Sequence, residues 1–186
     1  IKKKNKNIIL IVSKKLLQMQ MKKLNFDYRI NELDVKKIKF EKLQTNKINI
    51  INVDFKFQKT FDKITNKSNN YIEKCFVVAL ELIKKYKFSG LISGPISKKH
   101  FLQGKNLGIT EYLAEKTKKN NDVIMLIYNK RLSVSPITTH LALKDVHKNI
   151  SKKKIYKHVK LIDEFYIKKF NKKPKIAITG LNPHCE

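Results

Sequence analysis

The sequence predicts an α/β fold in which helices flank a layered, mainly parallel sheet. Short apolar runs alternate along the chain with amphipathic segments that are long enough to form helices. The 186 residues, of which 41% are hydrophobic, suffice for one globular domain with a sizeable core. No repeat, proline-rich linker or low-complexity tract divides residues 1–186, so the sequence identifies no internal domain boundary.

The first half of the chain predicts two strands and two helices. The apolar run at residues 7–12 is typical of a buried strand, and Ser13 is suited to cap a helix that continues through Leu24. Residues 47–53 form a second strand candidate, and Ser68 is suited to cap the next helix. The apolar residues of that helix recur at spacings of three and four, and they are Ile72, Cys75, Phe76, Ala79, Leu82, Ile83 and Tyr86.

The second half of the chain predicts four short strands and one long helix. The strand candidates are residues 91–93, 122–128, 132–139 and 175–179, and a turn at Asn129 and Lys130 separates the second from the third. Ser151 is suited to begin the helix, whose apolar face carries Ile155, Val159, Ile162, Phe165 or Tyr166, and Phe170. Ligands of parallel sheets bind beyond the carboxyl ends of strands, so we expect a site in the turns that follow these strands.

Four turns carry residues that are suited to chemistry, namely residues 93–98, 108–112, 138–141 and 180–184. Thr110 can cap a helix that starts at Glu111, and the free N–H groups of such a helix attract anions. His140 and His184 each follow a predicted strand, and imidazole is the commonest transition-metal ligand in proteins. Singly, each turn is more often structural and each histidine is more often a hydrogen-bonded loop residue. Together, the two histidines favour a shared metal.

The charge of the chain suggests a second class of function, a basic nucleic-acid-binding module. The formal net charge is +27. Only Arg29 and Arg131 among the 42 basic side chains are arginines, however, and arginine is the residue that recognises phosphates and bases best. Lysine, asparagine and isoleucine are encoded by AT-rich codons, so we interpret most of the charge as genomic drift. No nucleic-acid-binding signature is present.

Cysteine usage and hydropathy indicate a soluble, cytoplasmic protein. Cys75 and Cys185 lie far apart and form no CxxC pair, which is typical of a reduced compartment. No apolar run approaches the roughly 20 residues that cross a bilayer, and the first residues lack the pattern of a signal peptide.

Four motifs, taken in their order along the chain, resemble one known family. They are LISGPISK at residues 91–98, GITEYLA at 108–114, TTHLALKDV at 138–146 and GLNPH at 180–184. In this order and at this spacing they strongly resemble the 4-hydroxythreonine-4-phosphate dehydrogenase family of vitamin B6 biosynthesis. The motif-bearing region is residues 71–186, whereas the first 70 residues fit only in their pattern of strands and helices.

The resemblance implies an isopropylmalate-dehydrogenase-like homodimer that uses NAD (or NADP) and a divalent metal such as Zn, Mg or Co. The implied reaction is oxidation of 4-hydroxythreonine-4-phosphate followed by decarboxylation. The resemblance assigns His140 and His184 to two of the three metal-binding histidines and Thr110 to substrate contact, and no catalytic residue is identified. Ile109 stands where the family has a substrate-contacting histidine. A dehydrogenase of another phosphorylated hydroxy acid is therefore an alternative.

The resemblance also implies that the chain is incomplete at both ends. Members of the family begin with a strand and a GDPAGIGPE-like turn, which has no counterpart here. Their third metal-binding histidine and most of the dinucleotide site would follow Glu186. We therefore expect residues 1–186 to be a partial α/β dehydrogenase that is inactive by itself.

Overall fold

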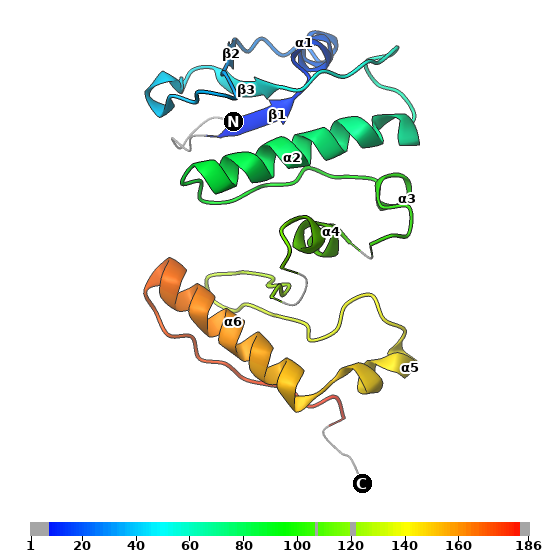
Figure 1. The fold of residues 1–186 in the computed structure, drawn as a ribbon, viewed down its shortest axis with the longest axis vertical. Coiled ribbons are helices and arrows are strands. Elements are labelled where there is room, and N and C mark those ends of the chain that lie inside the picture. Colours follow the sequence, from blue (N-terminus) through cyan, green and yellow to red (C-terminus); the bar gives the residue numbers. More distant parts are fainter. Residues whose placement is uncertain (1–7, 107, 120–121, 183–186) are drawn as a thin grey trace. The chain divides into compact units, whose positions relative to one another are not determined.

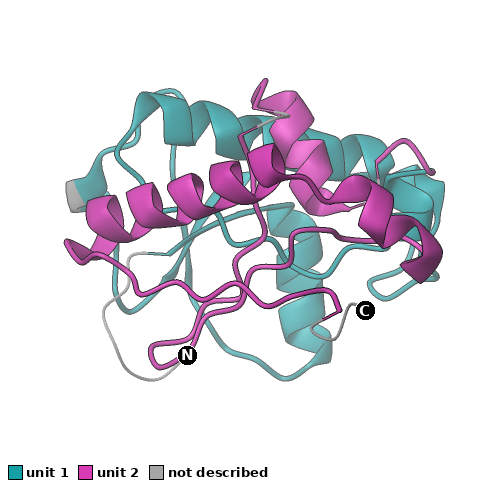
Figure 2. Cartoon of the chain, turned by 90° about the horizontal axis from the view of Figure 1, so that it is seen from below, with its two compact units in different colours: residues 1–103 teal, residues 104–186 magenta. Residues whose placement is uncertain are grey.

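The structure is a computed structural model that describes residues 8–106, 108–119 and 122–182. The chain divides into two compact units, residues 1–103 and residues 104–186 (Figure 2). The predicted fold class is confirmed, because unit 1 contains a parallel sheet that is flanked by helices. None of the helices in the described part of the chain is long and apolar enough to cross a membrane.

The sheet of unit 1 has three parallel strands in the order β1-β3-β2. Its strands are β1 (Ile9–Val12), β2 (Ile30–Glu32) and β3 (Ile48–Asn52). Strands β1 and β3 confirm the two predicted strands, while β2 escaped prediction because its three residues form no apolar run. Its place is held partly by polar contacts, since Asn31 donates its side-chain N–H to the side-chain oxygen of Asn49 at 2.8 Å.

Helices cover both faces of this sheet. Helix α1 (Lys14–Lys23) and helix α2 (Asn69–Lys85) lie on opposite sides of the strands (Figure 1). Adjacent residues of a strand point to opposite faces, and Ile50 and Ile51 are only 0% and 1% exposed. Both faces of the central strand β3 are therefore buried, as expected for a parallel sheet.

The two helices begin in different ways. Ser13 caps α1 as predicted, because its hydroxyl oxygen accepts the N–H of Leu16 at 3.4 Å. The predicted capping role of Ser68 is wrong, since its side chain makes no cap hydrogen bond to α2. The short helix η2 (Asn66–Ser68) precedes α2 instead, and the hydroxyl of Thr65 caps it by accepting the N–H of Lys67 at 3.3 Å.

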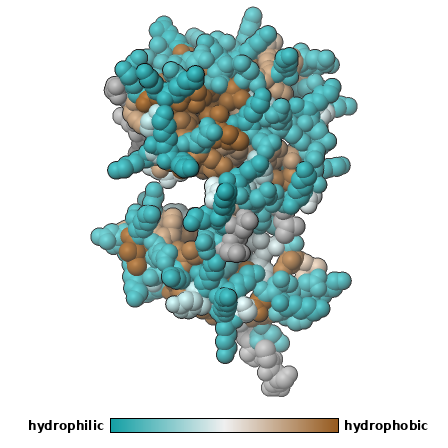
Figure 3. All heavy atoms as spheres, in the orientation of Figure 1, coloured by the Kyte–Doolittle hydropathy of each residue, from teal (hydrophilic) through white to brown (hydrophobic). Residues whose placement is uncertain are grey.

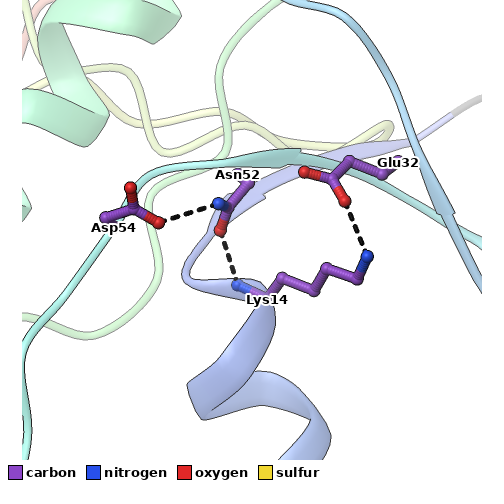
Figure 4. Close-up of polar contacts among 4 residues, drawn as sticks. All are labelled: Lys14, Glu32, Asn52 and Asp54. Atoms are coloured by element: carbon purple, nitrogen blue, oxygen red, sulfur yellow. Dashed lines mark hydrogen bonds and ion pairs between the residues drawn. The ribbon is translucent and has the colours of Figure 1, made fainter.

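Polar side chains tie the carboxyl ends of the strands together (Figure 4). Lys14 forms an ion pair with Glu32 at 2.8 Å. The side-chain oxygen of Asn52 accepts the backbone N–H of Lys14 at 2.8 Å, and its NH₂ group donates to Asp54 at 2.9 Å. These four residues satisfy one another, so this edge of the sheet is held by its own contacts.

Unit 1 ends in one short helix, and helices are the regular elements in the described part of unit 2. Helix α3 (Lys98–Phe101) belongs to unit 1. The helical segments of unit 2 are α4 (Ile109–Lys116), α5 (Leu143–Val146), η3 (His147–Asn149) and α6 (Lys152–Phe170). Ser151 caps α6 as predicted, with its hydroxyl oxygen accepting the N–H of Lys154 at 3.2 Å.

The four strands predicted at residues 91–93, 122–128, 132–139 and 175–179 are not formed in the part of the chain that the structure describes. A strand needs a paired neighbour, and the segments supply only one antiparallel bridge, between Ile127 and Val134. The turn between them is confirmed, because the side-chain oxygen of Asn129 accepts the N–H of Arg131 at 2.9 Å. Apolar side chains of these segments are left exposed, such as Leu132 at 74%.

Candidate functional site

His140 lies in an exposed turn of unit 2 with an unusual backbone conformation. Its φ angle is 56°, in the left-handed region that residues other than glycine seldom adopt. The preceding residues 132–139 are not a strand, so the expectation that His140 follows a strand is wrong. His184, its predicted partner, lies outside the described residues.

Helix α4 begins two residues earlier than the sequence predicts, at Ile109 instead of Glu111. Its N-cap is Gly108, whose carbonyl oxygen accepts the N–H of Tyr112 at 3.1 Å, so the expectation that Thr110 caps the helix is wrong. Glycine is among the residues favoured at an N-cap, and the backbone of Gly108 is extended, with φ −159° and ψ 179°. Thr110 is instead an exposed residue of the first turn, and Ile109 beside it is half-buried.

The start of α4 brings a carboxylate close to His140. A Cβ atom on Gly108 would lie 2.8 Å from Oε2 of Glu111 and 3.7 Å from Nε2 of His140. The two side chains therefore approach the same point above Gly108. Oε2 of Glu111 is buried and has no hydrogen-bond partner among the described residues. A buried, unpaired carboxylate oxygen is costly, so this atom marks a place suited to a donor or a cation.

Imidazole nitrogen and carboxylate oxygen are both ligands that zinc and similar divalent ions accept. The side chains of His140 and Glu111 thus fit a metal in their chemistry. Within the described ranges, however, no group of three or more His, Cys, Asp or Glu side chains lies together. The only signal for Glu111 in the sequence is its position three residues after Gly108, where a glutamate typically folds back over the start of a helix.

The first motif lies in unit 1, around the start of α3. The hydroxyl of Ser97 and Nδ1 of His100 lie 2.8 Å apart. Asn69, the first residue of α2, donates its side-chain N–H to the carbonyl oxygen of His100 at 2.7 Å. These contacts hold the segment after the motif against α2. Lys98, a possible phosphate ligand by charge, is exposed.

Two half-buried side chains of unit 1, Tyr71 and Cys75, have raised pKa values. Tyr71 stacks on Phe55 with ring centroids 4.6 Å apart, and its hydroxyl oxygen accepts the N–H of Ser13 at 2.9 Å. Burial raises the pKa of Tyr71 to about 12. Burial also raises the pKa of the Cys75 thiol. A thiol with a raised pKa is mostly protonated near neutral pH and is a poor nucleophile.

Comparisons with known proteins agree with the motifs. The family described as "Pyridoxal phosphate biosynthetic protein PdxA" matches residues 4–186. A 4-hydroxythreonine-4-phosphate dehydrogenase of Sulfurihydrogenibium sp. (strain YO3AOP1) is 36% identical over 187 residues, which cover 98% of this chain and 56% of that protein. A protein of Oceanobacillus iheyensis, named as a candidate D-threonate 4-phosphate dehydrogenase, is 28% identical over 183 residues, 95% of this chain and 54% of its own.

Solved structures show the same fold. A 4-hydroxythreonine-4-phosphate dehydrogenase from Klebsiella pneumoniae superposes with a TM-score of 0.79 at 21% identity and covers 95% of this chain and 55% of its own. One from Burkholderia phymatum superposes with a TM-score of 0.73 at 19% identity over 87% of this chain and 49% of its own. The chain therefore spans about half the length of the relatives that it matches. With a family match that runs along nearly all of its residues, the chain belongs to the PdxA family of pyridoxal phosphate biosynthetic proteins.

Proposed function

We propose that this chain acts in a metal-dependent, NAD-linked 4-hydroxythreonine-4-phosphate dehydrogenase of pyridoxal phosphate biosynthesis. The observation that carries the proposal is the 36% identity, along 98% of the chain, to a relative of that name. The chemistry of His140 and Glu111 at the start of α4 supports it. The active form proposed here is a cytoplasmic homodimer.

The proposed reaction removes a hydride from the carbon of the substrate's secondary alcohol, passes it to NAD⁺ or NADP⁺, and releases the hydroxyl proton to water. The product is a β-keto acid, which then loses carbon dioxide. Lewis-acid stabilisation of the developing alkoxide is the chemistry that a bound divalent ion such as Zn, Mg or Co supplies. In this chain, His140 and His184 would hold that ion through their imidazole nitrogens, and Thr110, exposed on the first turn of α4, would contact the substrate through its hydroxyl.

Zinc titration of the full-length protein by isothermal calorimetry tests the metal-binding role. We expect His140→Ala and His184→Ala to weaken zinc binding severely, because each removes one ligand. His147→Ala is the matched control, since His147 is exposed, lies on η3 and belongs to none of the four motifs. Equal affinity in the wild type and in both ligand variants would contradict the proposal.

A second candidate function is the dehydrogenation of another phosphorylated hydroxy acid. Ile109 favours it, because its hydrocarbon side chain stands where the resemblance places a polar contact with the substrate. The Oceanobacillus relative favours it too, since its name refers to D-threonate 4-phosphate. A hydrogen bond to a charged group contributes roughly 1.5–3 kcal/mol, so its loss weakens recognition without abolishing it.

Steady-state kinetics of two variants distinguish the two functions. If 4-hydroxythreonine-4-phosphate is the substrate, we expect Ile109→His to raise kcat/KM for this substrate and Thr110→Val to lower kcat/KM. The apolar control Ile109→Leu should change kcat/KM little. A fall in kcat/KM for Ile109→His, together with higher activity of the unmodified protein on D-threonate 4-phosphate, would favour the second candidate.

A further inference from the structure

We propose that Glu111 is a positioning residue, which orients the imidazole of His140 by accepting a hydrogen bond from its Nε2–H. Nδ1 of His140 is then left free to bind the metal. This inference rests on the proposed metal-binding function of His140. It adds a residue to that site to which neither the motifs nor the resemblance gives a role.

The placement of the carboxylate follows from the helix. Glu111 is the third residue of α4, and helical side chains point back toward the N-terminus. Its carboxylate therefore lies above Gly108, where Oε2 is 2.8 Å from the position of a Cβ atom. A Cβ atom at residue 108 would lie too close to this oxygen, so glycine at this position leaves space for the carboxylate.

The turn at residue 140 supplies the second group. Nε2 of His140 lies 3.7 Å from the same Cβ position, and this nitrogen, not Nδ1, is the one near Gly108. The backbone of His140 is left-handed, with φ 56°, and this conformation costs free energy in a residue that has a Cβ atom.

The chemistry of the two groups is complementary. Oε2 of Glu111 is buried without a hydrogen-bond partner in the described part of the chain, and the neighbouring imidazole carries an N–H donor. Both atoms lie within 4 Å of the same point above Gly108, which places a donor beside an acceptor. Metal-binding histidines commonly donate their second ring N–H to a carboxylate, which fixes the tautomer and makes the ligand nitrogen more basic.

The test measures the tautomer of His140 and the affinity for zinc in the full-length protein. Glu111→Leu removes the acceptor and keeps a side chain of similar size, and Glu111→Gln keeps one acceptor oxygen. Gly108→Ala keeps the side chains of both Glu111 and His140, and its added Cβ forces the carboxylate to move. The matched controls are Glu115→Leu, on the same helix and exposed, and Gly90→Ala, where a Cβ meets nothing within 4 Å.

Nitrogen-15 spectra of the metal-free protein report the tautomer directly. We expect the Nε2–H form of His140 to dominate in the wild type and both controls, and to give way to a mixture of tautomers in Glu111→Leu and Gly108→Ala. Glu111→Gln should restore much of the wild-type pattern. Unchanged tautomers in Glu111→Leu and Gly108→Ala, with circular dichroism showing a folded protein, would overturn the proposal.

Zinc affinity separates a positioning role from the alternatives. We expect Glu111→Leu and Gly108→Ala to weaken zinc binding by about 10–100-fold, the range seen for such partners of metal ligands. A loss in Glu111→Leu as complete as that in His140→Ala would make Glu111 a direct ligand and overturn the positioning role. If His140→Ala binds zinc as tightly as the wild type, the proposed metal function fails, and the tautomer spectra still decide whether Glu111 contacts His140.

Discussion

The backbone conformation of His140 predicts an effect on stability that does not depend on the imidazole. A left-handed conformation costs an alanine roughly 1–2 kcal/mol, and glycine avoids that cost but loses about 0.4–1 kcal/mol through its larger entropy in the unfolded chain. Because His140 has φ 56° and is exposed, we expect His140→Gly to be about 0.5–1 kcal/mol more stable than His140→Ala.

Urea denaturation of the two variants measures this difference in the free energy of unfolding. Metal binding should be lost equally in both, because neither retains the imidazole. Equal stability of the glycine and alanine variants would show that the turn relaxes out of the left-handed region once the histidine is gone.

Tyr71 makes a second prediction at the scale of one residue. Its pKa is raised from 10.0 to about 12 in the folded protein, chiefly by burial. Between these two values the unfolded chain loses the phenolic proton first, so the contribution of Tyr71 to stability is full below pH 10 and is lost as the pH rises toward 12. The stability advantage of the wild type over Tyr71→Phe should therefore shrink across that range.

The wild type and Tyr71→Phe contain the same lysines, so the effect of lysine titration on the free energy of unfolding cancels in their difference. The free energy of unfolding of each protein, measured by denaturant at several pH values, gives the advantage directly. Absorbance at 295 nm should also show one late-titrating tyrosine fewer in the variant. A constant difference in stability between pH 9 and pH 12 would contradict the raised pKa.

At the scale of the element, Ser151 determines where α6 begins. Its hydroxyl oxygen accepts the N–H of Lys154 at 3.2 Å, and Asn171 ends the helix in the left-handed conformation with φ 51°. Both are residues favoured at these positions, because one satisfies a free N–H group and the other tolerates positive φ. We expect Ser151→Ala to lower the free energy of unfolding by about 1 kcal/mol.

Ser68→Ala is the matched control for the cap, since Ser68 also precedes a long helix but makes no cap hydrogen bond. Its hydroxyl donates to the carbonyl oxygen of Thr65 at 3.2 Å on the exposed surface, so its removal should cost less. Thermal denaturation followed by circular dichroism compares the two variants. A larger loss of stability in Ser68→Ala than in Ser151→Ala would contradict this account of the caps.

At the scale of the whole molecule, positive charge outweighs negative charge almost everywhere along the chain. On the face that Figure 3 shows, hydrophilic side chains cover much of the surface of each unit, and hydrophobic ones form patches within each unit. Acidic partners are few beside 40 lysines, although Lys157 lowers the pKa of Asp122 through a hydrogen bond and its charge. The excess of lysine is therefore mostly solvated surface.

This distribution predicts how the protein behaves toward nucleic acid. Binding to duplex DNA should be independent of sequence and should fall steeply with salt, because it depends on the release of counterions. Fluorescence anisotropy with two unrelated duplexes, measured at increasing salt, checks both expectations. A salt-resistant preference for one sequence at physiological ionic strength would support the nucleic-acid-binding alternative instead.

The sequence by itself determined the elements whose signal is local. The helical periodicity of α2 and α6, the serine caps of α1 and α6, and the apolar runs of β1 and β3 depend on neighbours within a few residues. The order of the four motifs also identified the family, because each is a short stretch with distinctive residues.

Tertiary structure alone decided the features that need a distant partner. Strand β2 exists because β3 pairs with it, and residues 132–139 form no strand because the described residues supply only the bridge at Val134. The same holds at the candidate site, where Glu111 and His140 meet above Gly108 although 29 residues separate them in the chain. Pairing and burial depend on atoms brought together by folding, which a local sequence pattern does not contain.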